Sequence, residues 1–194
     1  SDRGRRVREG YRIVLIGETN AGKSSLFNAL TAREAAIVTP IAGTTRDVLD
    51  ADVMIGGYAV TLSDTAGLRD SDDVVEAEGI RRARLRAEGA DLRLWVRAPG
   101  VGEDLAAAFI QEDDLQILNK ADLGAAAPDD RLEALSISTT TGQGLSELHD
   151  WIAARLARDL AGADFPAVTR ERHRRRLVEA LAAWPAAEGR AGDG

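Results

Sequence analysis

The chain has 194 residues, of which 44% are hydrophobic and 29% are charged, as is typical of one globular domain with a small appendage. It has no cysteine, which excludes disulfides, cysteine-ligated zinc and a catalytic thiol. The formal net charge of −7 argues against a broad nucleic-acid-binding surface. No apolar run has transmembrane length and no signal peptide is recognisable, so we expect a cytoplasmic protein without a membrane contact.

Strand-like and helix-like segments alternate along the middle of the chain. Strands are predicted at Tyr11–Ile16, Val48–Ile55, Tyr58–Leu62, Leu92–Val96, Leu115–Leu118 and Ala134–Ile137. Helices are predicted at Ser24–Leu30, Ala77–Ala87, Glu103–Phe109 and Leu145–Leu160. Gly56-Gly57 predicts a tight antiparallel hairpin between the second and third strands. The pattern indicates an α/β fold with a roughly six-stranded, mostly parallel sheet and helices on both faces.

Both ends of the chain differ from the middle. Residues 1–10 are mostly basic and polar, and after Phe165-Pro166 apolar positions recur at helical spacing up to Trp184. A single amphipathic helix cannot bury its own apolar stripe, so this segment needs a partner. We therefore expect a central domain at 11–162, flanked at 1–10 and 163–194 by pieces of a neighbouring helical domain.

The segment from Gly17 to Ser24 has the form G-x-x-x-x-G-K-S and lies between a predicted strand and a predicted helix. That context defines a phosphate-binding P-loop. Its backbone amides, from Asn20 through Ser25, and the start of the helix face the phosphates of a nucleotide. The P-loop pattern assigns Lys23 to the β- and γ-phosphates and the Ser24 hydroxyl to Mg²⁺. The residues assigned to phosphate binding are Asn20, Ala21, Gly22, Lys23, Ser24 and Ser25.

Two further motifs select the base. Asn119-Lys120-Ala121-Asp122 follows a predicted strand, and the Asp122 carboxylate can accept hydrogen bonds from N1 and the 2-amino group of guanine, a pair that adenine lacks. Asn119 and Lys120 would support the base. Ser138-Thr139 follows the last predicted strand and would approach the base from its other side. These motifs predict GTP and GDP as ligands.

The segment Asp64-Thr65-Ala66-Gly67 ends the third predicted strand and belongs to the γ-phosphate side. Asp64 can hold the Mg²⁺ shell through water, and the Gly67 amide can meet the γ-phosphate. Thr45, in Gly43-Thr44-Thr45-Arg46, is the expected second protein ligand of Mg²⁺.

The residue after this motif is Leu68, where Ras-like GTPases have a water-orienting glutamine. The attacking water must therefore be activated by another residue. The acidic segment at 69–78 offers several carboxylates. Each of them is also explained as an acidic residue at the solvated start of a helix. A cation for the transition state is the other missing part. Arg46 and Arg69 lie in the switch segments near the expected γ-phosphate, but each is equally well explained by a purely structural role. The side-chain carbonyl of Asn20 offers another solution, a monovalent cation beside the phosphates.

Together these residues resemble the G domain of MnmE (TrmE), a GTPase that acts with MnmG in modifying the wobble uridine of certain tRNAs. The resemblance rests on Gly17 to Leu30, on Ile41-Ala-Gly-Thr-Thr-Arg-Asp47 and on Asp64-Thr-Ala-Gly-Leu-Arg69, and it extends from about Gly4 to about Leu181. It implies a Ras-like fold and the potassium-dependent hydrolysis of GTP. It also implies face-to-face dimerisation of G domains, with potassium in place of an arginine finger, and an MnmG-type partner and tRNA for the full-length protein.

The resemblance assigns individual roles. Asn20, the main-chain oxygens of Thr39 and Ile41, and Thr44 correspond to the potassium site. Ser24 and Thr45 correspond to the Mg²⁺ ligands, and Glu76 corresponds to the catalytic glutamate, which acts on the attacking water through a second water.

Two alternatives stay open. The Ile-Ala-Gly-Thr-Thr-Arg-Asp motif and Leu68 also occur in ribosome-assembly GTPases of the Era and EngA type. The chain could instead be a nucleotide-gated dimerisation module without turnover. The basic cluster from Arg170 to Arg176 is explained either as a solvated helical face or as a tRNA contact.

Overall fold

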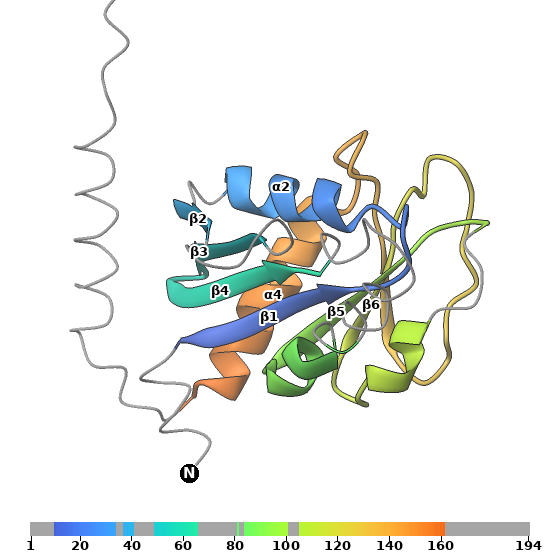
Figure 1. Cartoon of the computed structure of the whole chain (residues 1–194). Coiled ribbons are helices and arrows are strands. Elements are labelled where there is room, and N and C mark those ends of the chain that lie inside the picture. The colour runs from blue at the N-terminus through green and yellow to red at the C-terminus, as the bar shows by residue number, and fades with distance from the viewer. Residues whose placement is uncertain are drawn as a thin grey trace, which may run out of the picture.

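A computed structural model describes residues 10–33, 37–40, 49–65, 81, 84–100 and 105–161. These residues form a seven-stranded sheet in the order β2-β3-β4-β1-β5-β6-β7 (Figure 1). The strands are β1 (Tyr11–Ile16), β2 (Ile37–Pro40), β3 (Leu49–Ile55), β4 (Tyr58–Asp64), β5 (Leu92–Arg97), β6 (Leu115–Leu118) and β7 (Glu133–Ser136). The helices are α2 (Lys23–Arg33), the short 3-10 helix η2 (Leu105–Phe109) and α4 (Leu145–Asp159), and residues 84–89 are also helical.

The centre of the sheet is parallel and one edge is antiparallel. β1 lies between β4 and β5, and β6 and β7 continue the sheet in the same direction. β3 runs antiparallel to both β2 and β4. The carboxyl ends of β1, β4, β5 and β6 therefore meet at one edge of the sheet, where ligands bind in open α/β folds.

The hairpin between β3 and β4 depends on its two glycines. Gly56 and Gly57 have φ values of 57° and 84°, which L-residues with a side chain adopt only with strain. A Cβ atom on Gly56 would also lie 2.9 Å from the Cβ of Ala153 in α4. The predicted hairpin is confirmed, and its first glycine also permits the approach of α4.

The predicted Ras-like α/β class is confirmed, with two local differences. Ile37–Pro40 forms an additional strand that was not predicted, so the sheet has seven strands where roughly six were expected. This strand is short, pairs on one side only and ends in proline, and such edge strands carry a weak sequence signal. The segment predicted as a helix at Glu103–Phe109 contains a 3-10 helix at Leu105–Phe109. The predicted helix at Ala77–Ala87 lies only partly within the described residues.

Alternating side chains of β1 build two cores, one on each face of the sheet. Ile13 and Leu15 are fully buried against α2 and α4, which contributes roughly 1.5–3 kcal/mol for each such side chain. Val14 and Ile16 face the other side and pack with Ala87 of the helical segment 84–89. The apolar stripe predicted for α4 is confirmed, because Leu148, Ile152 and Leu156 are all fully buried.

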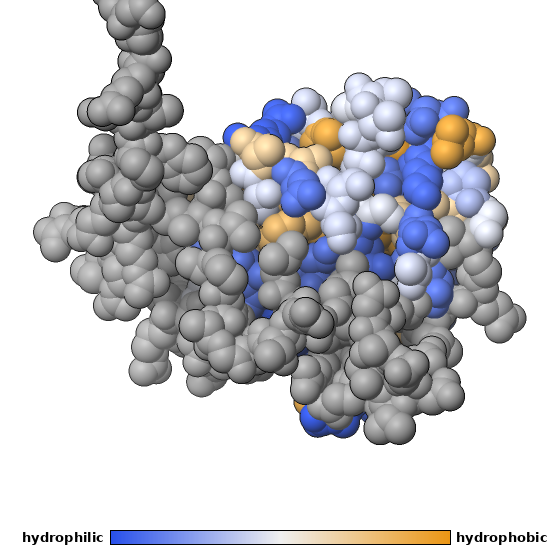
Figure 2. Space-filling view, turned by 45° about the horizontal axis from the view of Figure 1, so that its top comes forward, coloured by the Kyte–Doolittle hydropathy of each residue, from blue (hydrophilic) through white to orange (hydrophobic). Residues whose placement is uncertain are grey.

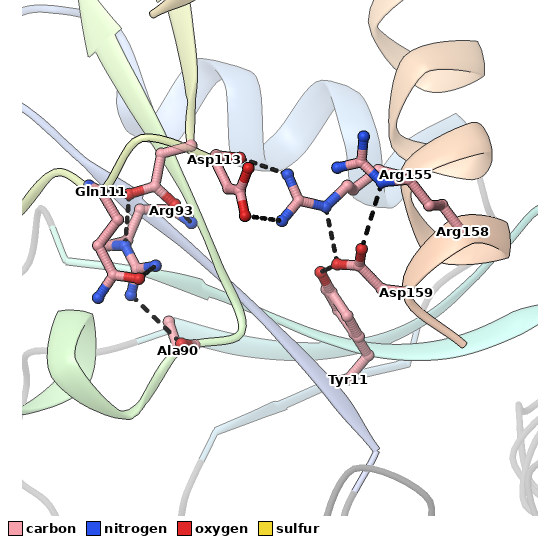
Figure 3. A network of polar contacts seen from close by, with 9 residues as sticks. Tyr11, Ala90, Arg93, Gln111, Asp113, Arg155, Arg158 and Asp159 are labelled. Atoms are coloured by element: carbon pink, nitrogen blue, oxygen red, sulfur yellow. Dashed lines mark hydrogen bonds and ion pairs between the residues drawn. The ribbon is translucent and has the colours of Figure 1, made fainter. Parts of the chain in front are cut away.

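A polar network ties the start of β1 to the end of α4 (Figure 3). The Tyr11 hydroxyl donates to Asp159 Oδ2 at 2.6 Å, and Arg155 Nε donates to the same oxygen at 2.7 Å. Burial and the hydrogen bond to Asp159 raise the pKa of Tyr11. Burial opposes ionisation of Asp159, but the hydrogen bonds from Tyr11 and Arg155 outweigh it and hold its pKa below the usual value. The network therefore joins the two ends of the described domain.

A second, fully buried ion pair lies beside this network. Arg93 Nε donates to Asp114 Oδ2 at 2.6 Å, and Arg93 Nη1 donates to the main-chain oxygens of Ala87 and Ala90. Figure 3 shows the contact between Arg93 and Ala90. Both carbonyls lie at the C-terminal end of the helical segment 84–89, and Arg93 satisfies them as hydrogen-bond acceptors. Arg93 thereby fixes the end of that segment against the start of β6.

The surface of the described residues has few large apolar side chains. Only Leu85 and Leu123 are strongly exposed among them. Among the coloured residues of the face in Figure 2, hydrophilic ones predominate. Within the described residues, no helix has the length and apolarity needed to cross a membrane.

Candidate nucleotide-binding site

The loop between β1 and α2 begins at a position that requires glycine. Gly17 has a φ of 140°, and a Cβ atom there would lie 2.1 Å from the main-chain oxygen of Val96 in β5. No rearrangement of a flexible side chain could relieve that clash, because the neighbour is backbone. The loop can leave the sheet here only without a side chain.

Gly22 is required for a different reason. Its φ is 96°, and a Cβ atom would lie 2.2 Å from Asn119 Nδ2. The two glycines of the predicted P-loop therefore let the loop lie close to β5 on one side and to the base motif on the other.

Lys23 is folded back over the loop. Its Nζ donates to the main-chain oxygens of Gly17 and Glu18, each at 2.7 Å, and the residue is 5% exposed. An ammonium group at this place, together with the N-terminal end of α2, makes the concave side of the loop attractive to phosphate.

The first turn of α2 contacts the end of β4. Ser24 Oγ donates to Asp64 Oδ2 at 2.7 Å, and the next residue, Thr65, donates its hydroxyl to the main-chain oxygen of Leu15 at 2.8 Å. Asp64 is buried with 2% exposure. A hydroxyl and a carboxylate oxygen that converge beside the phosphate loop fit the oxygen-ligand preference of Mg²⁺.

Three or more His, Cys, Asp or Glu side chains do not cluster as a metal site anywhere in the described ranges.

Two hydrogen bonds join the base motif, Asn119 to Asp122, to the phosphate loop. Asn119 Nδ2 donates to the main-chain oxygen of Ala21 at 2.9 Å, and Lys120 Nζ donates to the main-chain oxygen of Asn20 at 2.6 Å. Asn119 is 1% exposed and follows β6 directly. The sequence assigned both residues to the base, whereas their contacts with the loop were not predicted.

The Asp122 carboxylate, which the sequence predicts to recognise guanine, is held by a neighbouring side chain. Ser138 Oγ donates to Asp122 Oδ1 at 2.6 Å and accepts a hydrogen bond from the Thr141 amide. The Thr139 amide donates to Asn119 Oδ1 at 3.3 Å. Ser138 is fully buried. The structure thus brings the two predicted base-side segments together around one carboxylate.

Other predicted site residues are placed only in part or not at all. Thr39 lies in β2, where its backbone pairs with Asp50 of β3. The remaining predicted residues on the γ-phosphate and cation side lie outside the described residues: Ile41, Thr44, Thr45, Ala66, Gly67 and Glu76, together with Leu68, Arg46 and Arg69.

A cavity of about 300 Å³ lies elsewhere, beside the network of Figure 3. Its lining includes Asp113, Trp151 and Arg155. These residues come from α4 and the segment before β6, at the opposite ends of the strands from the phosphate loop. The cavity is therefore separate from the candidate nucleotide site.

Comparison with known proteins identifies the family. The model described as 50S ribosome-binding GTPase matches residues 12–126. The proteins named tRNA modification GTPase MnmE of Hyphomonas neptunium and Parvibaculum lavamentivorans are 48% and 49% identical to the chain. These matches cover 95% and 96% of this chain but 41% and 42% of the two relatives.

Solved structures agree at the level of the fold. The G domain of the T. maritima FeoB iron transporter has a TM-score of 0.57 and 25% identity, and the match covers 74% of this chain and 97% of that domain. A variant of Aquifex aeolicus Era bound to GDP and AlF4⁻ has a TM-score of 0.53 and 26% identity, over 74% of this chain and 55% of Era. The chain spans about two fifths of the length of its MnmE relatives. Loop geometry, base motif and comparisons agree that the chain belongs to the 50S ribosome-binding GTPase family, as a GTPase G domain of the MnmE type.

Proposed function

We propose that this domain hydrolyses GTP with Mg²⁺ and a stimulating potassium ion, in a cycle coupled to dimerisation, as part of a tRNA-modifying protein. The potassium proposal rests on the position of the Asn20 side chain. It lies in the phosphate loop with a φ of 65°, its side chain is exposed, and among the described residues its side-chain amide has no hydrogen-bond partner. The amide oxygen is therefore available to a cation beside the phosphates.

Mg²⁺ would be held by Ser24, by Thr45 and, through water, by Asp64. The contact of Ser24 with Asp64 supports this assignment, because it places the Ser24 hydroxyl oxygen and Asp64 Oδ2 only 2.7 Å apart. When bound, the ion would neutralise charge on the β- and γ-phosphates.

The potassium site would comprise Asn20, Thr44 and the main-chain oxygens of Thr39 and Ile41. This set is made of uncharged oxygens, which suits a monovalent cation. The ion would supply the positive charge that an arginine finger supplies in other GTPases. Glu76 would then position the attacking water, since Leu68 has no polar group for that task.

The relatives support a proposal about the larger protein to which the domain belongs. Proteins named tRNA modification GTPase MnmE match nearly the whole chain. We infer that the domain serves a protein that modifies tRNA together with an MnmG-type partner. Residues 1–10 and 163–194 would belong to a helical domain beside the G domain at 11–162.

The test uses the chain with GDP, Mg²⁺ and aluminium fluoride, in KCl or in NaCl. We expect a dimer by sedimentation in KCl and a monomer in NaCl. Glu76→Ala should abolish turnover and leave GDP binding intact. A monomer under all conditions would reject the dimerisation proposal, and unchanged turnover would reject the role of Glu76.

A second function is favoured by the description of the matching family model, 50S ribosome-binding GTPase. In this reading the domain serves a protein that binds the large ribosomal subunit. Cosedimentation of the GTP-loaded chain with purified 50S subunits would support it. Absence of binding at low salt would leave the tRNA-modification proposal as the better account.

A further inference from the structure

A direct hydrogen bond joins the guanine motif to the residue assigned to the potassium site. Lys120 Nζ donates to the main-chain oxygen of Asn20 at 2.6 Å, across 100 positions of sequence. The next loop residue is held in the same way, by Asn119 Nδ2 on the Ala21 oxygen. Two consecutive loop carbonyls are thus fixed by two consecutive residues of the base motif.

The donor side of this contact is rigid. The Asn119 amide donates to the main-chain oxygen of Arg97 at 2.8 Å, and the Ala121 amide donates to that of Ile137 at 3.0 Å. Lys120 lies between them with a φ of 59°, an unusual value for a residue with a side chain. Anchored on both sides by the sheet, the base motif can hold the loop in a fixed position.

The acceptor side is strained and exposed. Asn20 has a φ of 65°, in the left-handed region that asparagine tolerates better than most residues but still adopts at a cost. The contact with Lys120 opposes relaxation of this backbone. It therefore holds in place the residue whose side-chain oxygen would meet the cation.

We propose that Lys120 is a positioning residue for the monovalent cation, acting through the main chain of Asn20. This inference rests on the proposed potassium-stimulated activity. Preorganised oxygens bind an ion more tightly than mobile ones, because no ordering cost is paid on binding. Occupation of the guanine site and of the cation site are then coupled through one side chain.

The positive charge of Lys120 by itself would have the opposite effect on potassium binding. An ammonium near a cation site repels the cation, so a purely electrostatic role would make removal of Lys120 improve potassium binding. The positioning role makes removal weaken it. The direction of the change therefore separates the two roles.

The experiment measures turnover as a function of KCl at saturating GTP for the wild-type chain, Lys120→Arg and Lys120→Met. We expect the half-activating potassium concentration to rise roughly tenfold in Lys120→Met, the factor that a strain of this kind corresponds to. Lys120→Arg keeps a donor and should recover most of the wild-type value. Arg131→Met is the charge-matched control, because Arg131 is exposed and contacts Asp129, away from the loop.

A second readout is independent of turnover. Binding of a fluorescent GDP with aluminium fluoride is measured as a function of KCl concentration. The potassium concentration at half-maximal binding should rise by the same factor in Lys120→Met. Asn20→Ala should remove the potassium dependence, and adding Lys120→Met to that variant should not change its binding further. An unchanged or lowered midpoint in Lys120→Met, with a potassium-stimulated wild type, would overturn the inference. A wild type without potassium stimulation would instead overturn the proposed function itself.

Discussion

Ser24 donates its hydroxyl hydrogen to Asp64 across 2.7 Å and so joins the first turn of α2 to the last residue of β4. Both oxygens are assigned to the Mg²⁺ shell, one as a direct ligand and one through water. The contact holds the two oxygens together beside the phosphate loop, where a shared Mg²⁺ shell would lie.

Removal of the Ser24 hydroxyl should weaken Mg²⁺ binding. For Ser24→Ala we expect the Mg²⁺ concentration that half-saturates fluorescent GDP retention to rise about tenfold or more, since one of the two protein ligands is lost. Ser146→Ala, at the start of α4, is the control for loss of a serine hydroxyl at a helix N-terminus. Equal Mg²⁺ dependence in Ser24→Ala and the wild type would contradict the assignment.

Ser138 should affect guanine recognition without touching the base. In Ser138→Ala the Asp122 carboxylate loses its lateral donor and is no longer held in one orientation. We expect affinity for GDP to fall roughly tenfold, the equivalent of one hydrogen bond to a charged group, while weak ADP binding stays unchanged. Thr141→Ala is the matched change in the same loop. Calorimetry with both nucleotides checks the prediction, which fails if the two affinities change together.

Arg86 and Asp50 should stabilise the domain as a pair. Arg86 in the helical segment 84–89 contacts Asp50 of β3 at 2.8 Å, and the backbone of Asp50 pairs with Thr39 of β2. Both side chains are partly buried, so we expect a coupling free energy of about 0.5–1 kcal/mol in a double-mutant cycle of urea unfolding. The exposed pair Arg84–Glu88 is the control and should give less. Coupling no larger than that of the control would refute the prediction.

Tyr11 should contribute to stability in a pH-dependent way. The hydrogen bond from Tyr11 helps to lower the pKa of Asp159 below its unfolded value of about 3.9. That contribution is present above the unfolded pKa and is lost as the pH falls through the folded pKa. Tyr11→Phe should therefore cost about 1.5–3 kcal/mol of unfolding free energy at pH 7 and less at pH 3. Urea unfolding at both pH values tests this, and an equal loss at both would contradict it.

The local motifs of the site could be predicted from the sequence because each is a short run with its own chemistry. The P-loop, the base motif and Ser138 were all assigned in this way, and the structure brings these described segments together. The contact of Lys120 with Asn20 could not be predicted, because its partners are 100 residues apart and neither residue type signals the other. The steric need for glycine at position 22 depends on Asn119 and was hidden for the same reason.

Strands with strong apolar runs were also predictable. Tyr11–Ile16 and Leu115–Leu118 have the predicted bounds, since each is a buried run flanked by polar residues. The edge strand Ile37–Pro40 is short and pairs on one side, so its position depends on β3 rather than on its own sequence.

We propose that a potassium ion bound at Asn20 stimulates GTP hydrolysis. The most direct test compares turnover in KCl and in NaCl of equal ionic strength, at high protein concentration, for the wild-type chain and Asn20→Ala. We expect turnover to be at least roughly tenfold faster in KCl for the wild type, equivalent to about 1.4 kcal/mol in the barrier, and to be the same in both salts for Asn20→Ala. Equal wild-type rates in the two salts, or full potassium stimulation in Asn20→Ala, would contradict it.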